Sequence, residues 1–132
     1  MHPELRWTQR FTNYTAALTE LKQALQQTEY TVLERSGLIR MFEVTFELAW
    51  KTLKDLLSYE GYDAKSPRAV IKQAFQNNLI MDGELWLTVL EGRNLFAHVY
   101  SQEMAENAVK DIKEMYAPLL IALEDVLNRV KD

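Results

Sequence analysis

The stretch Glu34–Leu57 reads ERSGLIRMFEVTFELAWKTLKDLL and decides the fold of this 132-residue chain. Its apolar side chains recur every three or four residues, which is the spacing of one face of an α-helix. The residues that follow this spacing are Ile39, Phe42, Phe46, Ala49, Leu53 and Leu56. Further apolar residues lie off this stripe, and such a helix is usually buried centrally or against a partner. We expect one helix from about Tyr30 to Glu60, ended by Gly61.

A second long helix is expected before this stretch, and a short one after it. The first runs from about Pro3 to Gln27, because apolar residues again recur at helical spacing. Those residues are Phe11, Tyr14, Leu18, Leu21 and Leu25. Ser66 followed by Pro67 is typical of an N-cap and a first helical position. The short helix that this pair begins is expected to end at Asn77-Asn78.

Two more helices are expected in the second half of the chain. The fourth starts near Glu84 with Asp82 as its N-cap, and the fifth begins near Gln102. Pro118 lies inside the apolar pattern of the fifth helix, so we expect a kink near Ala117. No strand-like alternation or internal repeat appears in the sequence. These patterns predict an all-α antiparallel bundle of four main helices and one short one, in a single domain over residues 1–132.

The composition is that of a globular protein and excludes several classes. Apolar residues make up 48% and charged residues 26% of a chain long enough for a real core. The absence of cysteine excludes disulfides and thiolate zinc sites, and it suits the cytoplasm. No apolar run approaches the ~20 residues of a membrane span, and no signal peptide is expected. The net charge of −4 argues against a general nucleic-acid coat, but it leaves local contact with a single RNA strand open.

Candidate chemistry lies in the stretch RNLFAHVY, residues 93–100. The only other histidine is His2, so His98 is the one available candidate for acid–base chemistry near neutral pH. An arginine beside it suits a phosphate ester, because a guanidinium can bind two phosphate oxygens at once. The imidazole can then move a proton. Arg93 and His98 are therefore the candidate catalytic pair.

Helical geometry limits this pair within one chain. On an ideal helix five residues turn through about 140° beyond a full turn, so Arg93 and His98 share a face only if the helix ends or distorts near Ala97. Asn94 and His98 do share a face, and Asn94 is a candidate to orient the imidazole. The plainer alternative is that Arg93 makes an ordinary ion pair while His98 caps or packs near a helix end.

Other candidate sites have plainer interpretations. Glu43, Glu47 and Lys51 follow one another at intervals of four, which favours ordinary salt bridges along one helix. A di-metal site in a bundle needs Glu-x-x-His repeats, and neither histidine has such a glutamate, so no metal or cofactor is expected. The sequence has no phosphate-binding glycine loop. Its tryptophans lie within helical patterns, which favours core or subunit contacts over base stacking.

Several stretches together resemble one family. They are RWTQRFTNY, ERSGLIRMFEVTFELAWKTLKDLL, SPRAVIKQAF, MDGELWLTVLEGRN and AHVY, in this order. The chain resembles the HEPN superfamily, and within it the nucleotidyltransferase substrate-binding subunits that are similar to HepT toxins. The resemblance implies a helical homodimer and a partner, a minimal nucleotidyltransferase encoded as a separate protein.

The resemblance also implies roles for the candidate residues. In HepT-like members the pattern R-x4-H-x-Y belongs to a metal-independent ribonuclease, and it falls on Arg93, His98 and Tyr100. The partner acts as antitoxin by transferring AMP to the motif tyrosine, which is Tyr100 in this sequence. Asn94 matches the polar residue that often follows the arginine. Ala97 departs from the serine that many members carry before the histidine.

Two functions of different classes follow from the resemblance. The first is a toxin ribonuclease with RNA as substrate, in which two copies of the chain supply two His98 side chains and Arg93 converges on them from the other subunit. The second is a non-catalytic subunit that presents a nucleotide substrate to the nucleotidyltransferase. The intact motif favours the first, while the acidic net charge and Ala97 favour the second. A helical adaptor without a site is a third interpretation.

Overall fold

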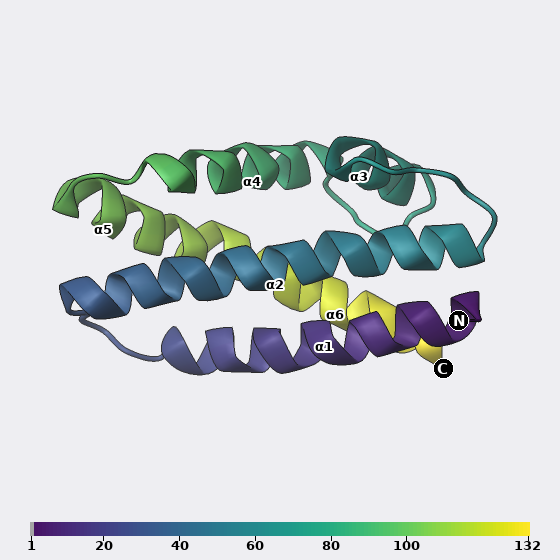
Figure 1. Ribbon diagram of the computed structural model, residues 1–132, viewed down its shortest axis with the longest axis horizontal. Coiled ribbons are helices and arrows are strands. Elements are labelled where there is room, and N and C mark those ends of the chain that lie inside the picture. The colour runs from purple at the N-terminus through teal and green to yellow at the C-terminus, as the bar shows by residue number, and fades with distance from the viewer. Residues whose placement is uncertain (1) are drawn as a thin grey trace.

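A computed structural model describes residues 2–132, and every regular element in that range is helical (Figure 1). The elements are α1 (Pro3–Ala24), α2 (Val32–Tyr59), α3 (Pro67–Gln76), α4 (Gly83–Leu95), the 3₁₀ turn η1 (Phe96–His98), α5 (Gln102–Asp111), the π turn η2 (Ile112–Tyr116) and α6 (Ala117–Lys131). The expectation of an all-α chain is confirmed. Between residues 2 and 132, no helix is long and apolar enough to cross a membrane.

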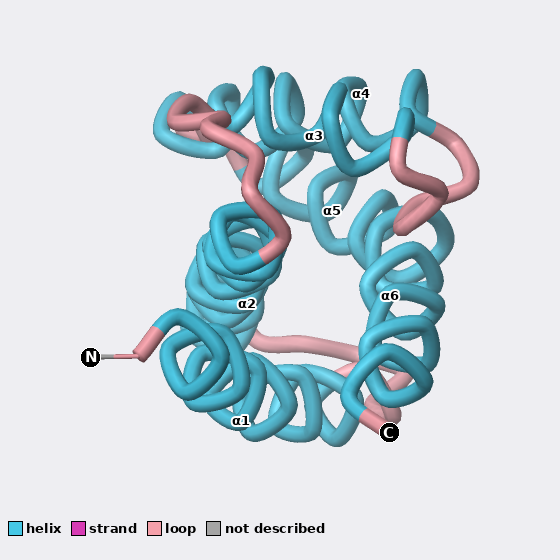
Figure 2. Tube along the Cα trace, turned by 90° about the vertical axis from the view of Figure 1, so that its right-hand side faces the viewer, coloured by secondary structure: helices cyan, strands magenta, loops and turns pink. Residues whose placement is uncertain are grey.

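The helices run back and forth along one long axis (Figure 1). The helix α1 leads to α2 in the opposite direction, α4 returns, and α5 with α6 runs parallel to α2. Seen along this axis in Figure 2, α1, α2 and α6 surround the interior, while α3 and α4 cover one side. The four long segments plus the short α3 match the predicted set, with α5, η2 and α6 together forming the fifth helix.

The helix α2 provides more of the core than any other element. Its predicted stripe is buried throughout, with Phe42, Phe46 and Leu53 fully inaccessible. Residues off the stripe are buried too, including Leu38 and Leu57, so two faces of α2 are covered. The tryptophans at positions 7, 50 and 86 are all buried, which assigns them to the core. Burial of each large apolar side chain contributes about 1.5–3 kcal/mol relative to exposure.

Polar contacts tie α1 to its neighbours. The buried Tyr14 hydroxyl donates to the carbonyl oxygen of Leu120 in α6, and burial raises the pKa of Tyr14 well above its usual value. The Arg10 Nε donates to an Asp55 carboxylate oxygen in α2 at 3.0 Å. A tyrosine buried with its hydroxyl satisfied fixes the rotation of a helix as well as its distance, because the bond requires a particular carbonyl.

The predicted helix starts are confirmed by side-chain caps. Ser66 accepts from the Ala69 amide at 3.1 Å, and Asp82 accepts from the Leu85 amide at 3.0 Å. The helix α2 begins two residues later than expected, at Val32, because Thr31 and Glu34 form a reciprocal capping box. The helix α1 ends at Ala24 rather than Gln27. After it the Gln26 amide donates to the Gln23 carbonyl, three residues back, so the last turn has the tighter 3₁₀ geometry.

Two helices end in the same backbone motif. At the end of α2, Gly61 adopts a φ of 96°, the Tyr62 amide donates to the Leu57 carbonyl at 2.8 Å, and the Gly61 amide donates to Ser58. At the end of α3, Asn78 adopts a φ of 61° with the corresponding pair of bonds. This is the Schellman arrangement, which satisfies the last carbonyls and reverses the chain. The predicted stop at Gly61 is confirmed.

The irregularity expected near Ala117 is a π turn over Ile112–Tyr116. The Ala117 amide donates to the carbonyl of Ile112, five residues back. Pro118 lacks an amide proton and its ring crowds the preceding turn, so a wider turn relieves the conflict. Burial raises the pKa of the Tyr116 side chain that this turn places in the core.

Tyr116 occupies space that only a glycine opposite it leaves free. A Cβ at Gly92 in α4 would overlap the Tyr116 hydroxyl oxygen and would lie 3.0 Å from the ring carbon that bears it. The Tyr116 ring also lies 5.3 Å from the Phe42 ring and 6.1 Å from the Phe96 ring. The π turn, α2 and the end of α4 therefore meet at one aromatic cluster: Phe42, Phe96 and Tyr116.

We expect Gly61→Ala to destabilise the protein, because an L side chain at this φ costs about 1–2 kcal/mol while nothing lies within 4 Å to clash. The matched control is Gly37→Ala, in an exposed helix interior with equally open space, which gains about 0.5–1 kcal/mol. Urea unfolding at equal protein concentration measures both changes in the free energy of unfolding. A Gly61→Ala protein as stable as the wild type contradicts the turn.

We expect Gly92→Ala to lower the free energy of unfolding by about 1–3 kcal/mol, because the new methyl group overlaps the Tyr116 hydroxyl. The second change Tyr116→Phe removes the overlapping oxygen and restores part of that loss in the double variant. A double-variant cycle in urea measures the coupling between the two sites. Losses that simply add would show that Gly92 and Tyr116 are not in contact.

Candidate functional site

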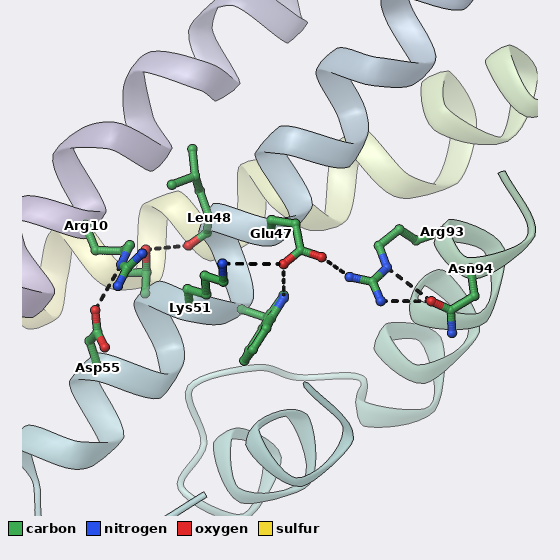
Figure 3. A network of polar contacts seen from close by, with 9 residues as sticks. Arg10, Glu47, Leu48, Lys51, Asp55, Arg93 and Asn94 are labelled. Carbon is green, nitrogen blue, oxygen red and sulfur yellow. Dashed lines mark hydrogen bonds and ion pairs between the residues drawn. The ribbon is translucent and has the colours of Figure 1, made fainter. Parts of the chain in front are cut away.

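Arg93 lies in the last turn of α4 and points towards α2 (Figure 3). Its Nη1 donates to the carboxylate of Glu47, an ion pair between two helices. Its Nε and Nη2 donate to the Asn94 side-chain oxygen at 3.3 and 2.8 Å. The guanidinium also lies over the Phe46 ring, with 5.7 Å between Cζ and the ring centroid. Arg93 is thus held by Glu47, by Asn94 and by the face of the Phe46 ring.

Glu47 is the centre of this contact network (Figure 3). Besides Arg93, it accepts from the Trp50 indole nitrogen at 2.9 Å and lies 3.9 Å from the Lys51 ammonium. The predicted salt bridge along the helix is therefore present for Glu47 and Lys51. In residues 2–132, no group of three or more acidic or histidine side chains is placed to hold a metal ion. The plainer alternative, an ordinary ion pair at Arg93, is therefore present, but the sequence did not identify Glu47 as the partner, because 46 positions separate the two residues.

The segment after Arg93 leaves the helix. The helix α4 ends at Leu95, the 3₁₀ turn η1 follows over Phe96–His98, and Val99 is extended. Phe96 anchors this turn, because its ring lies 5.5 Å from the Phe42 ring in the core. The side chains of His98 and Tyr100 lie on the surface, and Tyr100 is 81% exposed. The helix thus ends close to Ala97, which was the condition for Arg93 and His98 to share a face.

His98 and Tyr100 contact each other. The His98 Nδ1 lies 3.1 Å from the Tyr100 hydroxyl oxygen, and the two rings meet edge to face. If Nδ1 accepts the hydroxyl proton, the neutral imidazole carries its own proton on Nε2, and if Nδ1 donates, Nε2 is the basic nitrogen. In either tautomer Nε2 makes no hydrogen bond within residues 2–132, so it is the atom available for proton transfer.

Within one chain no hydrogen bond joins Arg93 and His98. Arg93 bonds to Glu47 and Asn94, while His98 bonds to Tyr100, and no hydrogen bond joins the two pairs in residues 2–132. Asn94, the candidate to orient the imidazole, makes no hydrogen bond to His98, and its side-chain oxygen accepts from Arg93 instead. The expectation assumed a helix that continues to His98, whereas α4 ends at Leu95 and the spacing of four no longer places both on one face.

A cleft of about 380 Å³ adjoins this segment. It lies where the first turns of α2 and α5 meet the loop that follows η1. Its lining residues are Val32, Arg35, Ser36, Ile39, Phe96, Val99, Tyr100, Ser101, Gln102 and Ala105. A larger hollow of about 550 Å³ lies between α3 and the start of α4, at the opposite end of α4 from Arg93. The smaller cleft is the one that shares a residue, Tyr100, with the predicted site.

Comparisons with known proteins agree with this fold. The chain matches the family described as nucleotidyltransferase substrate binding protein like over residues 9–129. It is similar to a protein from Thermus thermophilus of known crystal structure, with 32% identity and a TM-score of 0.78 over 90% of this chain and 99% of that one. No curated protein shows a significant match. Since the family match includes α2, α4 and the 93–100 segment, this chain belongs to the family of nucleotidyltransferase substrate binding-like proteins.

Proposed function

We propose that this chain is a HepT-like, metal-independent endoribonuclease that works in a two-component system with a separately encoded minimal nucleotidyltransferase. One observation carries the proposal: α4 ends just after Arg93, and the next turn exposes His98 and Tyr100 as a contacting pair. A histidine with a free Nε2 and a modifiable hydroxyl are thus paired on the short segment that follows Arg93. The family's description, with its reference to a nucleotidyltransferase, supports the partner.

The proposed reaction needs a base and an acid and no metal ion. The ribose 2′-oxygen attacks phosphorus, the bond from phosphorus to the 5′-oxygen breaks, and a 2′,3′-cyclic phosphate and a 5′-hydroxyl result. One neutral His98 takes the 2′-hydroxyl proton through Nε2, and a second, protonated His98 gives a proton to the leaving 5′-oxygen. Arg93 holds the phosphate and stabilises the charge that develops on its oxygens.

The second imidazole requires a second copy of the chain. Exposed apolar side chains around the site support a surface that another copy covers. Val32 and Leu33 at the start of α2 are 69% and 83% exposed, and Leu95 at the end of α4 is 65% exposed. Exposed apolar side chains gathered at one end of a bundle are typical of an interaction surface. In such a homodimer, Arg93 of one subunit and His98 of the other form one site.

Modification of Tyr100 would silence this site. The Tyr100 oxygen attacks the α-phosphorus of ATP held by the partner, the bond to the pyrophosphate breaks, and the phenolic proton goes to solvent. The product places a negatively charged phosphodiester and an adenosine on the oxygen that lies 3.1 Å from His98 Nδ1. Both charge and volume then oppose binding of an RNA phosphate at the same imidazole.

A second candidate function is a non-catalytic subunit that presents substrate to the nucleotidyltransferase. The ion pair between Glu47 and Arg93 favours it, because this carboxylate already neutralises the arginine that should bind the RNA phosphate. Ala97, in place of a hydroxyl-bearing residue, favours it as well. This candidate predicts a stable complex with the nucleotidyltransferase and no RNA cleavage.

We expect His98→Ala to lower the rate of RNA cleavage in EDTA by about a hundredfold or more, because it removes the proton-transfer group. Purified wild type and variant are compared on single-stranded RNA, and growth arrest on expressing the chain without its partner is scored in parallel. The matched control is His2→Ala, which changes the only other histidine and leaves cleavage intact. Cleavage that survives His98→Ala removes His98 from this role, and a wild type without cleavage or arrest favours the second candidate.

We expect Tyr100→Phe to remain an active nuclease that the nucleotidyltransferase no longer neutralises, because the acceptor oxygen is gone. Mass spectrometry after incubation with the partner and ATP measures the added adenylyl groups on wild type and variant. Tyr62→Phe, at another exposed tyrosine, serves as control and is modified like the wild type. Adenylyl transfer to Tyr100→Phe at the wild-type level contradicts Tyr100 as the acceptor.

A further inference from the structure

Arg35 has hydrogen-bond donors that nothing in residues 2–132 satisfies. It lies in the first turn of α2 and is half-buried. Its Nη1 donates to the Tyr30 carbonyl at 2.8 Å, while its Nε is buried without any partner. No carboxylate of residues 2–132 lies within 4 Å of its guanidinium. A buried donor without a partner costs about 1–3 kcal/mol, so its persistence calls for an explanation.

The position of Arg35 suits a bound anion, because its guanidinium has no carboxylate partner among the described residues and its side chain lines a cleft. A cation in the first turn of a helix opposes the helix dipole, which favours negative charge there. Arg35 lines the 380 Å³ cleft beside Tyr100, and the first turn of α5 lines the same cleft through Ser101 and Gln102. An anion in this cleft would lie beside Arg35 and near the first turns of α2 and α5, which carry the acidic residues Glu34 and Glu103. Glu29 and Glu106 line a separate hollow with Arg35, without an ion pair to it.

The rest of the cleft suits a nucleobase. Ile39, Phe96 and Val99 give it apolar and aromatic walls, and Ser36 and Gln102 add neutral hydrogen-bonding groups. Its volume of about 380 Å³ lies within the range of about 300–1,000 Å³ that is usual for small-molecule sites. An apolar surface can stack against a nucleobase, and an arginine at its edge can bind the phosphate of the same nucleotide.

We infer that this cleft binds one nucleotide, with its phosphate on Arg35 and its base against Phe96 and Val99. The inference rests on the proposed function, which it deepens by placing a substrate nucleotide beside Tyr100. The nucleotide is either free or one unit of an RNA strand, and both carry the same phosphate and base. Arg35 is then a binding residue of the site, with the Tyr100 side chain forming part of the cleft wall.

Two binding experiments test this assignment. Calorimetric titration of the wild type with adenosine 5′-monophosphate measures the free nucleotide. Titration of His98→Ala with a short oligoadenylate RNA measures a strand without cleavage. In both, Arg35→Gln weakens binding by about ten- to a hundredfold, which is the usual effect of losing a charge-assisted contact. Arg40→Gln is the matched control, since Arg40 is an exposed arginine of the same helix that does not line the cleft.

A second variant separates binding from folding. Ala105→Phe fills the cleft from α5 without touching the Arg35 side-chain charge, and it also abolishes nucleotide binding. Urea unfolding and light scattering establish that each variant keeps its stability and its oligomeric state. If Arg35→Gln itself unfolds, Ala105→Phe and the charge-preserving Arg35→Lys, which loses the fork geometry, carry the test.

The outcomes are distinct. Weaker binding of both probes in Arg35→Gln supports a site that accepts a free nucleotide, and weaker binding of the RNA alone supports one unit of a strand. Equal binding by Arg35→Gln and wild type, an equal loss in Arg40→Gln, or no binding of either probe by the starting proteins overturns the assignment. Because these titrations measure binding without cleavage, their failure leaves the result of the His98→Ala experiment standing, and the reverse also holds.

Discussion

The burial of α2 on two faces is the constraint on which the rest of the structure depends. A helix that is apolar around most of its circumference cannot lie on a surface, so it requires helices on more than one side. The helix α1 covers one face, and Phe42 and Phe46 face the aromatic side chains of α4 and η2. The narrow polar strip that remains carries Glu47, and this strip is where Arg93 binds. The site is therefore built against the least apolar part of the central helix.

Three local irregularities connect the buried face of α2 to the candidate site. Pro118 favours a π turn, the π turn directs Tyr116 into the core, and Gly92 lets α4 approach the Tyr116 hydroxyl. With α4 held there, Phe96 packs into the same cluster and ends the helix. The polar residues that follow then have no place in the core, and His98 emerges on the surface. Exposure of the imidazole thus follows from packing, and it does not require any local preference of the histidine.

A feature could be predicted when the residues that determine it lie close together in the sequence. The stripe of α2, the caps at Ser66 and Asp82 and the stop at Gly61 depend on residues within one or two turns, and the sequence predicts them. The Glu47–Arg93 pair and the Gly92–Tyr116 contact join distant segments, and no local sequence pattern predicts them. The role expected for Asn94 depended on the end of α4, which a tertiary contact of Phe96 determines.

The charge distribution is compatible with the proposed phosphate site on an acidic chain. A net charge of −4 repels a polyanion at long range, so affinity for one must come from a few short contacts. Arg93 is bound by the Glu47 carboxylate, while Arg35, in the cleft that the 96–101 segment lines, has no carboxylate partner in the part of the chain that the structure describes. Glu47 lowers the charge that Arg93 presents until a competing phosphate arrives, while Arg35 meets no such competitor. An RNA strand that first binds at the proposed Arg35 site would raise the local concentration of phosphate near Arg93, and this order would make the Glu47–Arg93 ion pair compatible with the proposed nuclease function.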